Sequence, residues 1–334
     1  MSTLGQGSPP LKTRKLHAAS CLPWRNASAI LRFMMNNRDI FDRELVRHRR
    51  DRASSDFGCH DFLFREVSDR LIDRLVDIQR NFPVALDLGR HSGPLPANSS
   101  VEWLVRGALS FGMAQMSPRA DLVVDEEFLP FSNSVFDLIL SNLSLHWVND
   151  LPGALTQIQR ALKPDGLFLA AILGGDTLVE LRDCLLTAES EAQGGASPRV
   201  SPMVALGDAA GLLQRAGFAI PVADSDTINV TYDNAFRLMA DLRGMGEANA
   251  VQERLHRFTP RSVFMRAAEL YQQRYSGPDN RINATFEVIY LHGWAPHESQ
   301  QKPLRPGSAE QRLANALDTE ERPADETPET YKKS

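Results

Sequence analysis

The spacing of apolar positions over residues 59–80 predicts an amphipathic helix. Apolar residues recur there three and four positions apart, which places them on one helical face, with Arg and Asp on the other. The apolar face consists of Phe64, Val67, Leu71, Leu75 and Ile78. We expect this helix to lie across a sheet, ahead of its first strand.

A different pattern follows, in which short continuous apolar runs alternate with helical segments. Runs of this kind are typical of buried parallel strands, and they occupy residues 84–88, 101–105, 121–124, 135–140 and 167–173. Between the last two runs, Asn149 or Asp150 can cap a helix with Pro152 in its first turn. Residues 163–166 (Lys-Pro-Asp-Gly) then predict a turn. This alternation predicts an α/β domain with a mostly parallel, doubly wound sheet.

The second half of the chain predicts further helices and two more strand regions. Thr177 and Glu180 have the spacing of a capping box for a helix that follows. We expect a helix over 203–216, a strand or hairpin over 218–230, helices over 234–243 and 261–275, and a final antiparallel strand over 286–291.

These patterns divide the chain into four parts. We expect a basic disordered leader at 1–38 and an N-terminal helical segment at 39–81. The α/β domain spans 82–298 with a helical insertion at about 233–275, and a polar, Pro-rich disordered tail spans 299–334.

Composition narrows the functional classes. A net charge of −5 and a pI near 5.9 give no basic footprint for nucleic acid. The three cysteines form no C-x-x-C pair and are expected to be reduced thiols. No run of 18 apolar residues predicts a membrane span. The leader contains no Asp or Glu, so it is either a mitochondrial transit peptide or a disordered or upstream extension.

Candidate ligand-binding residues lie where the expected strands end. In an open parallel sheet, ligands bind at the carboxyl ends of the strands, beside the first one. The first strand ends in Asp87-Leu-Gly89, with Gly93 four residues later. Glycines allow a backbone to approach a ligand closely, and the acid can hold an amino or hydroxyl group.

The order of motifs over 82–173 resembles the class I S-adenosylmethionine-dependent methyltransferases. The third strand ends in Asp125-Glu126, and Phe136-Asp137 and Lys163-Pro-Asp-Gly166 follow. The resemblance implies a Rossmann-like fold with S-adenosylmethionine as cofactor. It implies the following cofactor-binding residues: Asp87, Gly89, Gly93, Asp125, Glu126 and Asn142. Asp137 and Gly166 would be structural.

A more specific resemblance covers residues 36–301. Five stretches carry it: 36–42, 125–131, 144–151 (Ser-Leu-His-Trp-Val-Asn-Asp-Leu), 174–178 (Gly-Gly-Asp-Thr-Leu) and 293–299 (Gly-Trp-Ala-Pro-His-Glu-Ser). They are similar to respiratory complex I assembly factors with a methyltransferase fold, whose mitochondrial members are arginine hydroxylases and which have alphaproteobacterial relatives. The partner implied is a complex I subunit or assembly intermediate.

Three departures from the methyltransferase pattern argue against strong cofactor binding. Arg90 stands where a small residue is usual after the first glycine, and Ala108 stands where an acid usually holds the ribose hydroxyls. The 94–100 link to the second strand contains Pro94 and Pro96 and is too short for the usual crossover helix.

Two residues are candidate catalytic groups, each with a structural alternative. His146 is placed to face a substrate, or it caps the fourth strand while Trp147 packs in the core. Asp176 binds substrate at the rim of the site above the strand ends, or its charge only favours the start of the following helix. The arginines over 47–52 are expected to form a solvated helical face rather than a partner site. The histidines show no facial triad for non-haem iron.

Three functions remain open. The chain is a complex I assembly protein that modifies an arginine, a methyltransferase acting on a small molecule or carrier protein, or a non-catalytic assembly chaperone. We expect it at the membrane surface where complex I is assembled, in a bacterial cytoplasm or alternatively in the mitochondrial matrix.

Overall fold

The computed structural model describes residues 39–300, apart from residues 90, 92, 94, 96–99 and 117. The leader, Arg90, most of the 94–100 link and residues 301–334 lie outside the described residues, so the expectations for them stay predictions.

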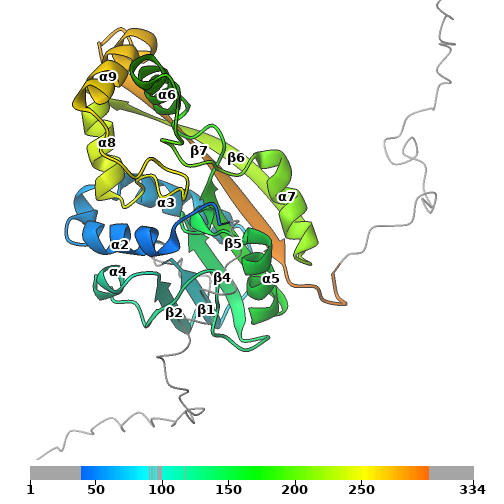
Figure 1. The fold of residues 1–334 in the computed structure, drawn as a ribbon. Coiled ribbons are helices and arrows are strands. Elements are labelled where there is room, and N and C mark those ends of the chain that lie inside the picture. The colour runs from blue at the N-terminus through cyan, green and yellow to red at the C-terminus, as the bar shows by residue number, and fades with distance from the viewer. Residues whose placement is uncertain are drawn as a thin grey trace, which may run out of the picture.

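A seven-stranded sheet forms the centre of the molecule (Figure 1). The strands are β1 (Val84–Leu88), β2 (Trp103–Ala108), β3 (Leu122–Val123), β4 (Phe136–Asn142), β5 (Leu162–Leu173), β6 (Ala219–Tyr232) and β7 (Ile282–Trp294). Their order is β3-β2-β1-β4-β5-β7-β6. Strands β1 to β5 are parallel, and β7 runs antiparallel between β5 and β6. The predicted Rossmann-like class I methyltransferase fold, with its antiparallel final strand, is confirmed.

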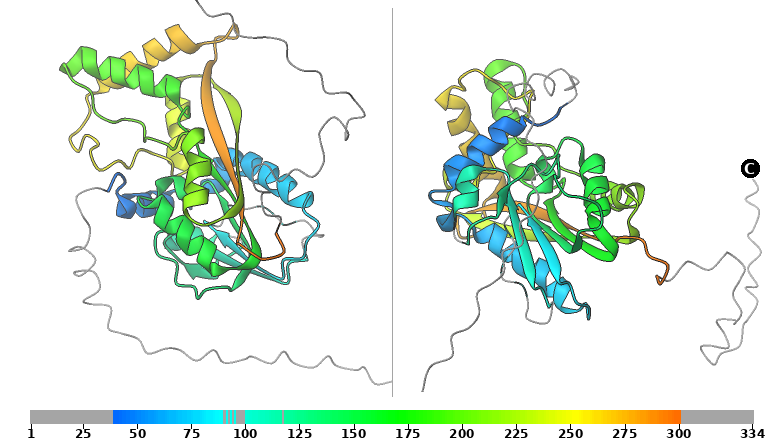
Figure 2. Two further views of the ribbon diagram at one scale, coloured as in Figure 1. Left: turned by 90° about the vertical axis from the view of Figure 1, so that its right-hand side faces the viewer. Right: turned by 90° about the horizontal axis from the view of Figure 1, so that it is seen from below.

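Helices cover both faces of the sheet (Figures 1 and 2). They are α2 (Arg43–Ala53), α3 (Phe62–Val76), α4 (Phe111–Gln115), α5 (Leu151–Ala161), α6 (Val179–Gln193), α7 (Leu206–Arg215), α8 (Ala235–Gly244) and α9 (Arg261–Tyr275), with 3-10 turns η1 (Phe57–Cys59) and η3 (Leu145–Trp147). Alternate side chains of each strand point to opposite faces. Ala85 therefore packs in one core with α3, α6, α8 and α9, whereas Leu86 packs in the other with α5 and α7.

Helix α2 lies over the carboxyl ends of the strands. Asp42 caps it by accepting a hydrogen bond from the Leu45 backbone nitrogen at 3.0 Å. The helix packs chiefly against α4 and α8. Its arginines therefore reach the loops that follow β3 and β4, which places this helix at the candidate site.

Several element boundaries differ from the predicted ones. Strand β2 begins at Trp103 rather than Val101, and β7 is longer than predicted at both ends. Of the strand and the hairpin expected over 218–230, the structure has the single strand β6. Residues 163–166 do not leave the sheet as a turn. They form the start of β5, with Asp165 at φ +64° and a register shift against β4.

The predicted capping box is wrong. Helix α6 has Leu178 as its N-cap, in the left-handed region at φ +56°. The Thr177 hydroxyl instead donates to the Glu287 carbonyl at 3.0 Å, and Glu180 accepts from the Thr285 backbone nitrogen at 3.2 Å. Both capping side chains are thus used by β7, because this strand passes beside the start of α6.

Candidate functional site

The end of β1 approaches the end of β4 closely. Asp87 is buried, at 1% exposure. Gly89 has φ +101° and donates its backbone N–H to the Gly107 carbonyl at 3.0 Å. A Cβ atom on Gly89 would lie 2.6 Å from the Ser144 Cβ. Glycine is required here by backbone conformation and by this contact.

Asn142 anchors the glycine segment. Its Nδ2 donates to the His91 carbonyl at 2.7 Å and to the Phe64 carbonyl at 2.8 Å. The Gly93 N–H donates to the Ser68 hydroxyl at 2.5 Å, which adds a second link to α3. In this structure, Asn142 and Gly93 hold the loop against the helix that precedes β1. Whether they also contact a cofactor stays a prediction.

Four acidic residues and two arginines form an ion-pair cluster above the strand ends. Arg43 Nη2 lies 2.5 Å from both Asp125 Oδ1 and Glu126 Oε2, and Arg43 Nε lies 3.7 Å from Glu127 Oε1. Arg50 Nη1 lies 3.3 Å from Glu126 Oε1. The cluster is defined as Arg43, Arg50, Asp125, Glu126, Glu127 and Glu247. Because α2 supplies both arginines, this helix neutralises part of the acid-rich segment after β3.

Arg50 corrects the prediction of a solvated arginine face. Its side chain is 2% exposed and contacts the Ser144 Oγ at 3.2 Å, in addition to Glu126. Arg47 on the same helix is exposed. The spacing of apolar residues along the helix gives no sign that Arg50 is buried. A buried arginine requires carboxylate partners, and here these are distant in the sequence.

The cluster shifts the pKa values of its members. Burial raises the pKa of Glu126, but Arg43 and Arg50 outweigh it, and the pKa lies below its ordinary value. Burial would lower the pKa of Arg43, but Glu126 and Asp125 raise it above its ordinary value. Burial raises the pKa of Glu127. The pair between Glu126 and the arginines is therefore charged at neutral pH.

His146 and Trp147 on η3 both bind one carboxylate. His146 Nε2 lies 2.9 Å from Glu247 Oε2, and the Trp147 Nε1–H donates to the same oxygen at 2.7 Å. The His146 and Glu247 side chains are 0% and 4% exposed. Burial raises the pKa of Glu247, but His146 and Arg50 bring it below its ordinary value. Trp147 also packs edge-on against Phe41, with ring centroids 5.3 Å apart.

Asp176 lies apart from His146, on the loop between β5 and α6. Its side chain is exposed, and its backbone N–H donates to Glu287 Oε2 at 2.9 Å. The next residue, Thr177, lines a cavity that Trp147 and Glu247 also line. Neither candidate catalytic residue is among the residues that line this cavity, although each stands next to one that does, and their catalytic role stays a prediction.

The cofactor implied by the fold family can be tested against these residues. Asp87 and Gly89 lie at the carboxyl end of β1, where the resemblance places the methionine end of S-adenosylmethionine. Ala108 ends β2, is 1% exposed and offers no side-chain acceptor for ribose hydroxyls. Asp125 Oδ1 already accepts from Arg43 and from the Glu127 N–H, the latter at 3.0 Å. Ala108 therefore lacks the ribose contact that the resemblance implies, and Arg43 occupies one oxygen of the acid implied for adenine. Whether Asp87 and Gly89 contact the amino-acid end of the cofactor stays a prediction.

Arg43, Arg50 and Glu247 were not predicted as site residues. Glu247 follows α8 in a stretch without a recognisable motif, and the two arginines belong to a helix of low apolar content. The segment Asp125-Glu126-Glu127 was the one available signal, since three consecutive acids at a strand end, of which Glu126 is buried, require cations nearby.

One protein-family model agrees with the fold. The family model "Methyltransferase domain" matches residues 109–170. A solved structure, the YcgJ protein of Bacillus subtilis, is 14% identical and covers 69% of this chain and 99% of its own, with a TM-score of 0.46.

Sequence relatives are more informative. "Arginine-hydroxylase NDUFAF5, mitochondrial" of Danio rerio is 42% identical over 86% of this chain and 90% of its own length. The human protein of the same name is 44% identical over 81% of each chain. A malonyl-[acyl-carrier protein] O-methyltransferase of Xylella fastidiosa is 32% identical over 77% of this chain and 89% of its own. Identity is higher with the first two, and the chain belongs to the NDUFAF5 arginine-hydroxylase family.

Proposed function

We propose that this protein assists the assembly of respiratory complex I and hydroxylates an arginine of a complex I subunit. The name of its relatives supports the reaction. Identity above 40% over most of the chain supports proposing the same reaction for this protein. The observation that carries the choice against methyl transfer is Ala108 at the end of β2, because its side chain offers no acceptor for the ribose hydroxyls of the methyl donor. The pairing of Arg43 with Asp125 Oδ1 adds to it, since that oxygen belongs to the acid that would contact adenine.

Hydroxylation requires an oxidant and a reductant. One C–H bond of the arginine side chain is replaced by C–OH, with the oxygen atom taken from O2. The second oxygen leaves as water, with two protons and two electrons from an external reductant. In this proposal both O2 and the reductant come from outside the chain.

S-adenosylmethionine is proposed as a weak ligand. Asp87 and Gly89 support contact with its amino-acid end, while Ala108 removes the usual support for its ribose. A methyltransferase acting on a small molecule or a carrier protein is the second candidate function, favoured by the 32% identity with the malonyl carrier enzyme. A non-catalytic assembly chaperone is the third.

The proposed partner is a subunit or assembly intermediate of complex I. No helix in the described part of the chain has the length and apolar content to cross a membrane. The relatives' names place them in mitochondria, which supports the matrix as the location. A bacterial cytoplasm beside the inner membrane stays the other proposed location.

Deleting the gene in its native host tests these functions together. We expect less assembled complex I on blue-native gels, normal growth without biotin, and loss of one oxygen atom of mass from an arginine peptide of a complex I subunit. Restored wild-type protein should reverse both defects. Normal complex I with biotin auxotrophy would instead establish the carrier methyltransferase. An assembly defect without any change in arginine mass would establish the chaperone.

A further inference from the structure

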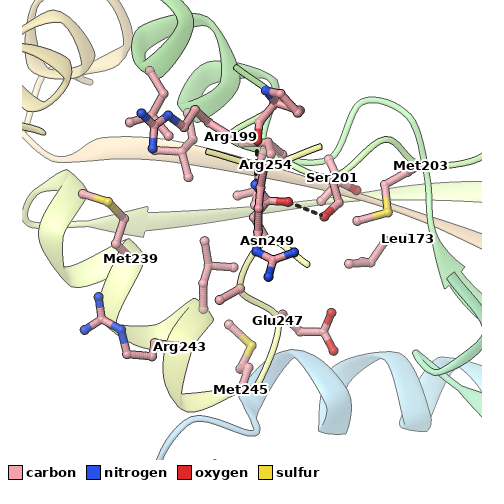
Figure 3. Close-up of a pocket in the computed structure, with 18 of the residues that line it drawn as sticks. Leu173, Arg199, Ser201, Met203, Met239, Arg243, Met245, Glu247, Asn249 and Arg254 are labelled. Carbon is pink, nitrogen blue, oxygen red and sulfur yellow. Dashed lines mark hydrogen bonds between the residues drawn. The ribbon is translucent and has the colours of Figure 1, made fainter. Parts of the chain in front are cut away.

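A cavity of about 300 Å³ lies beyond the carboxyl end of β5 (Figure 3). Its wall is mainly apolar and includes side chains of β5, α6, α8 and β7 and of the segment before α7, among them Leu173, Leu181, Leu242, Phe286 and Met203. A water molecule occupies about 30 Å³ in the liquid, so the cavity has room for about ten atoms of that size. Its ligand is therefore small and largely apolar.

The charged groups of the wall are mostly positive. Four arginines and one glutamate line the cavity, namely Arg49, Arg199, Arg243, Arg254 and Glu247. The glutamate already faces donors, because its Oε2 accepts from His146 and Trp147, and Arg50 Nη2 lies 3.8 Å from its Oε1. Its negative charge is thus compensated within the protein.

Two of the four arginines are compensated in the same way. Arg199 Nη2 lies 2.5 Å from Glu189 Oε1, and Arg254 Nη2 lies 3.1 Å from Asp42 Oδ2. The other two, Arg49 and Arg243, have no carboxylate within ion-pair distance in the described part of the chain. Arg243 is exposed, and its guanidinium extends away from Glu247 (Figure 3).

Arg49 is the half-buried cation without a carboxylate partner. Its Nη1 donates to the carbonyls of Ala248 and Asn249, while its Nε and Nη2 make no hydrogen bond to the described residues. Burial and the neighbouring Arg254 lower the pKa of Arg49 to about 10, although Asp42 partly opposes them. The guanidinium is therefore charged at neutral pH, and an anion beside it would relieve the cost of holding two cations close together.

We propose that this cavity binds a small carboxylate with a single apolar chain, of the kind found in a saturated fatty acid of about eight carbons. The carboxylate accepts hydrogen bonds from Arg49 Nε and Nη2, since a guanidinium presents paired donors that match the two carboxylate oxygens. The chain packs against leucine and methionine side chains such as Leu181 and Met203, and methionine adapts its shape to a flexible chain.

The size of the cavity favours this ligand over a phospholipid, because two acyl chains with a headgroup exceed about 300 Å³. The site uses none of the groups that the arginine reaction requires of its substrate. The proposal therefore goes beyond the proposed function, and either can fail without the other.

Three probes of nearly equal size test the charge preference by calorimetry on the full chain. Octanoate should bind the wild-type protein. Octanamide has the same shape without the charge and should bind at least about tenfold more weakly, because it loses charge-assisted hydrogen bonds to Arg49. Octylammonium, with the opposite charge, should bind more weakly than octanamide.

Variants locate the site. Arg49→Met should weaken octanoate binding by at least about tenfold and leave octanamide binding nearly unchanged. Arg47→Met, on the exposed face of the same helix, is the matched control and should bind octanoate as the wild type does. If Arg49→Met disturbs folding, Met203→Trp fills the cavity without touching the hydrogen bonds of Arg49, and it should abolish binding of both probes.

Several results would overturn the proposal. They are equal binding of octanoate and octanamide, stronger binding of octylammonium, no binding of octanoate to the wild type, or unchanged octanoate binding in Met203→Trp or in a folded Arg49→Met. Binding to phosphatidylglycerol vesicles without binding to monomeric octanoate would also overturn it, because it would identify a lipid surface as the ligand.

Discussion

Arg50 and Glu126 form a buried ion pair that joins helix α2 to the loop after β3. Their side chains are 2% and 0% exposed, and Arg50 Nη1 lies 3.3 Å from Glu126 Oε1. Ser144, which follows β4, hydrogen-bonds to both side chains. One pair of charges thus fixes the N-terminal helix to two strand ends at the centre of the candidate site.

Replacing Arg50 should destabilise the whole fold. Arg50→Met removes a positive charge that faces the buried carboxylates of Glu126 and Glu247. Breaking a buried ion pair by removing one partner costs about 3 kcal/mol or more. Arg47→Met, on the exposed face of the same helix, should change the free energy of unfolding by less than about 0.5 kcal/mol. Urea denaturation measures both. Equal stability of the two variants would show that the pair contributes nothing.

The stability contributed by Glu126 should depend on pH. Its pKa in the folded protein lies below the ordinary value of 4.5, because Arg43 and Arg50 outweigh the effect of burial. This stabilisation is therefore complete above 4.5 and is lost as the pH falls toward the folded pKa. Glu126→Gln should be less stable than wild type at neutral pH, and the difference should shrink below pH 4.5.

Denaturation curves at a series of pH values check this prediction. Glu253→Gln, at an exposed position, serves as the matched control and should follow the wild type throughout. A difference between Glu126→Gln and wild type that stays constant across the acid range would contradict the assignment.

Gly89→Ala should destabilise the end of β1. An alanine at this position would have to adopt φ +101°, and its Cβ would lie 2.6 Å from the Ser144 Cβ. Strain of this kind costs about 1–3 kcal/mol. Gly195→Ala has no atom within 4 Å of the added Cβ and should be nearly neutral. Thermal or urea unfolding compares them, and a neutral Gly89→Ala would indicate that the loop can move away from Ser144.

S-adenosylmethionine should bind weakly. The charge-assisted hydrogen bonds from ribose are absent at Ala108, which costs roughly 1.5–3 kcal/mol, or on the order of ten- to a hundredfold in affinity. Ala108→Asp should tighten binding in calorimetric titration, and Ala108→Asn should tighten it less. Because Ala108 is buried, unfolding of each variant must be checked first. A low micromolar dissociation constant for the wild type would refute the prediction.

The sequence predicts the sheet better than it predicts the site. Continuous apolar runs at 84–88 and 135–140 correspond to β1 and β4, since burial on both faces leaves a local pattern. Arg50 and Glu247 escape prediction because each depends on partners that are distant in the chain. The capping box at Thr177 fails for the same reason, since β7 competes for the side chains that would cap α6.

The last prediction separates a docking role from a structural one at two aspartates. Asp137 Oδ2 accepts from the Val84 N–H at 2.9 Å and lies 2.8 Å from Lys163 Nζ, so Asp137 ties β4 to its neighbouring strands. Asp176 has an exposed side chain beside the cavity-lining Thr177. Asp176→Ala should therefore weaken rescue of complex I assembly in the deletion strain while leaving unfolding nearly unchanged. Asp137→Asn should lower stability but retain rescue as long as the protein folds.

Blue-native gels and unfolding curves are needed together, because reduced rescue with reduced stability would give Asp176 a structural role. Full rescue by Asp176→Ala would show that the Asp176 side chain does not contribute to partner binding.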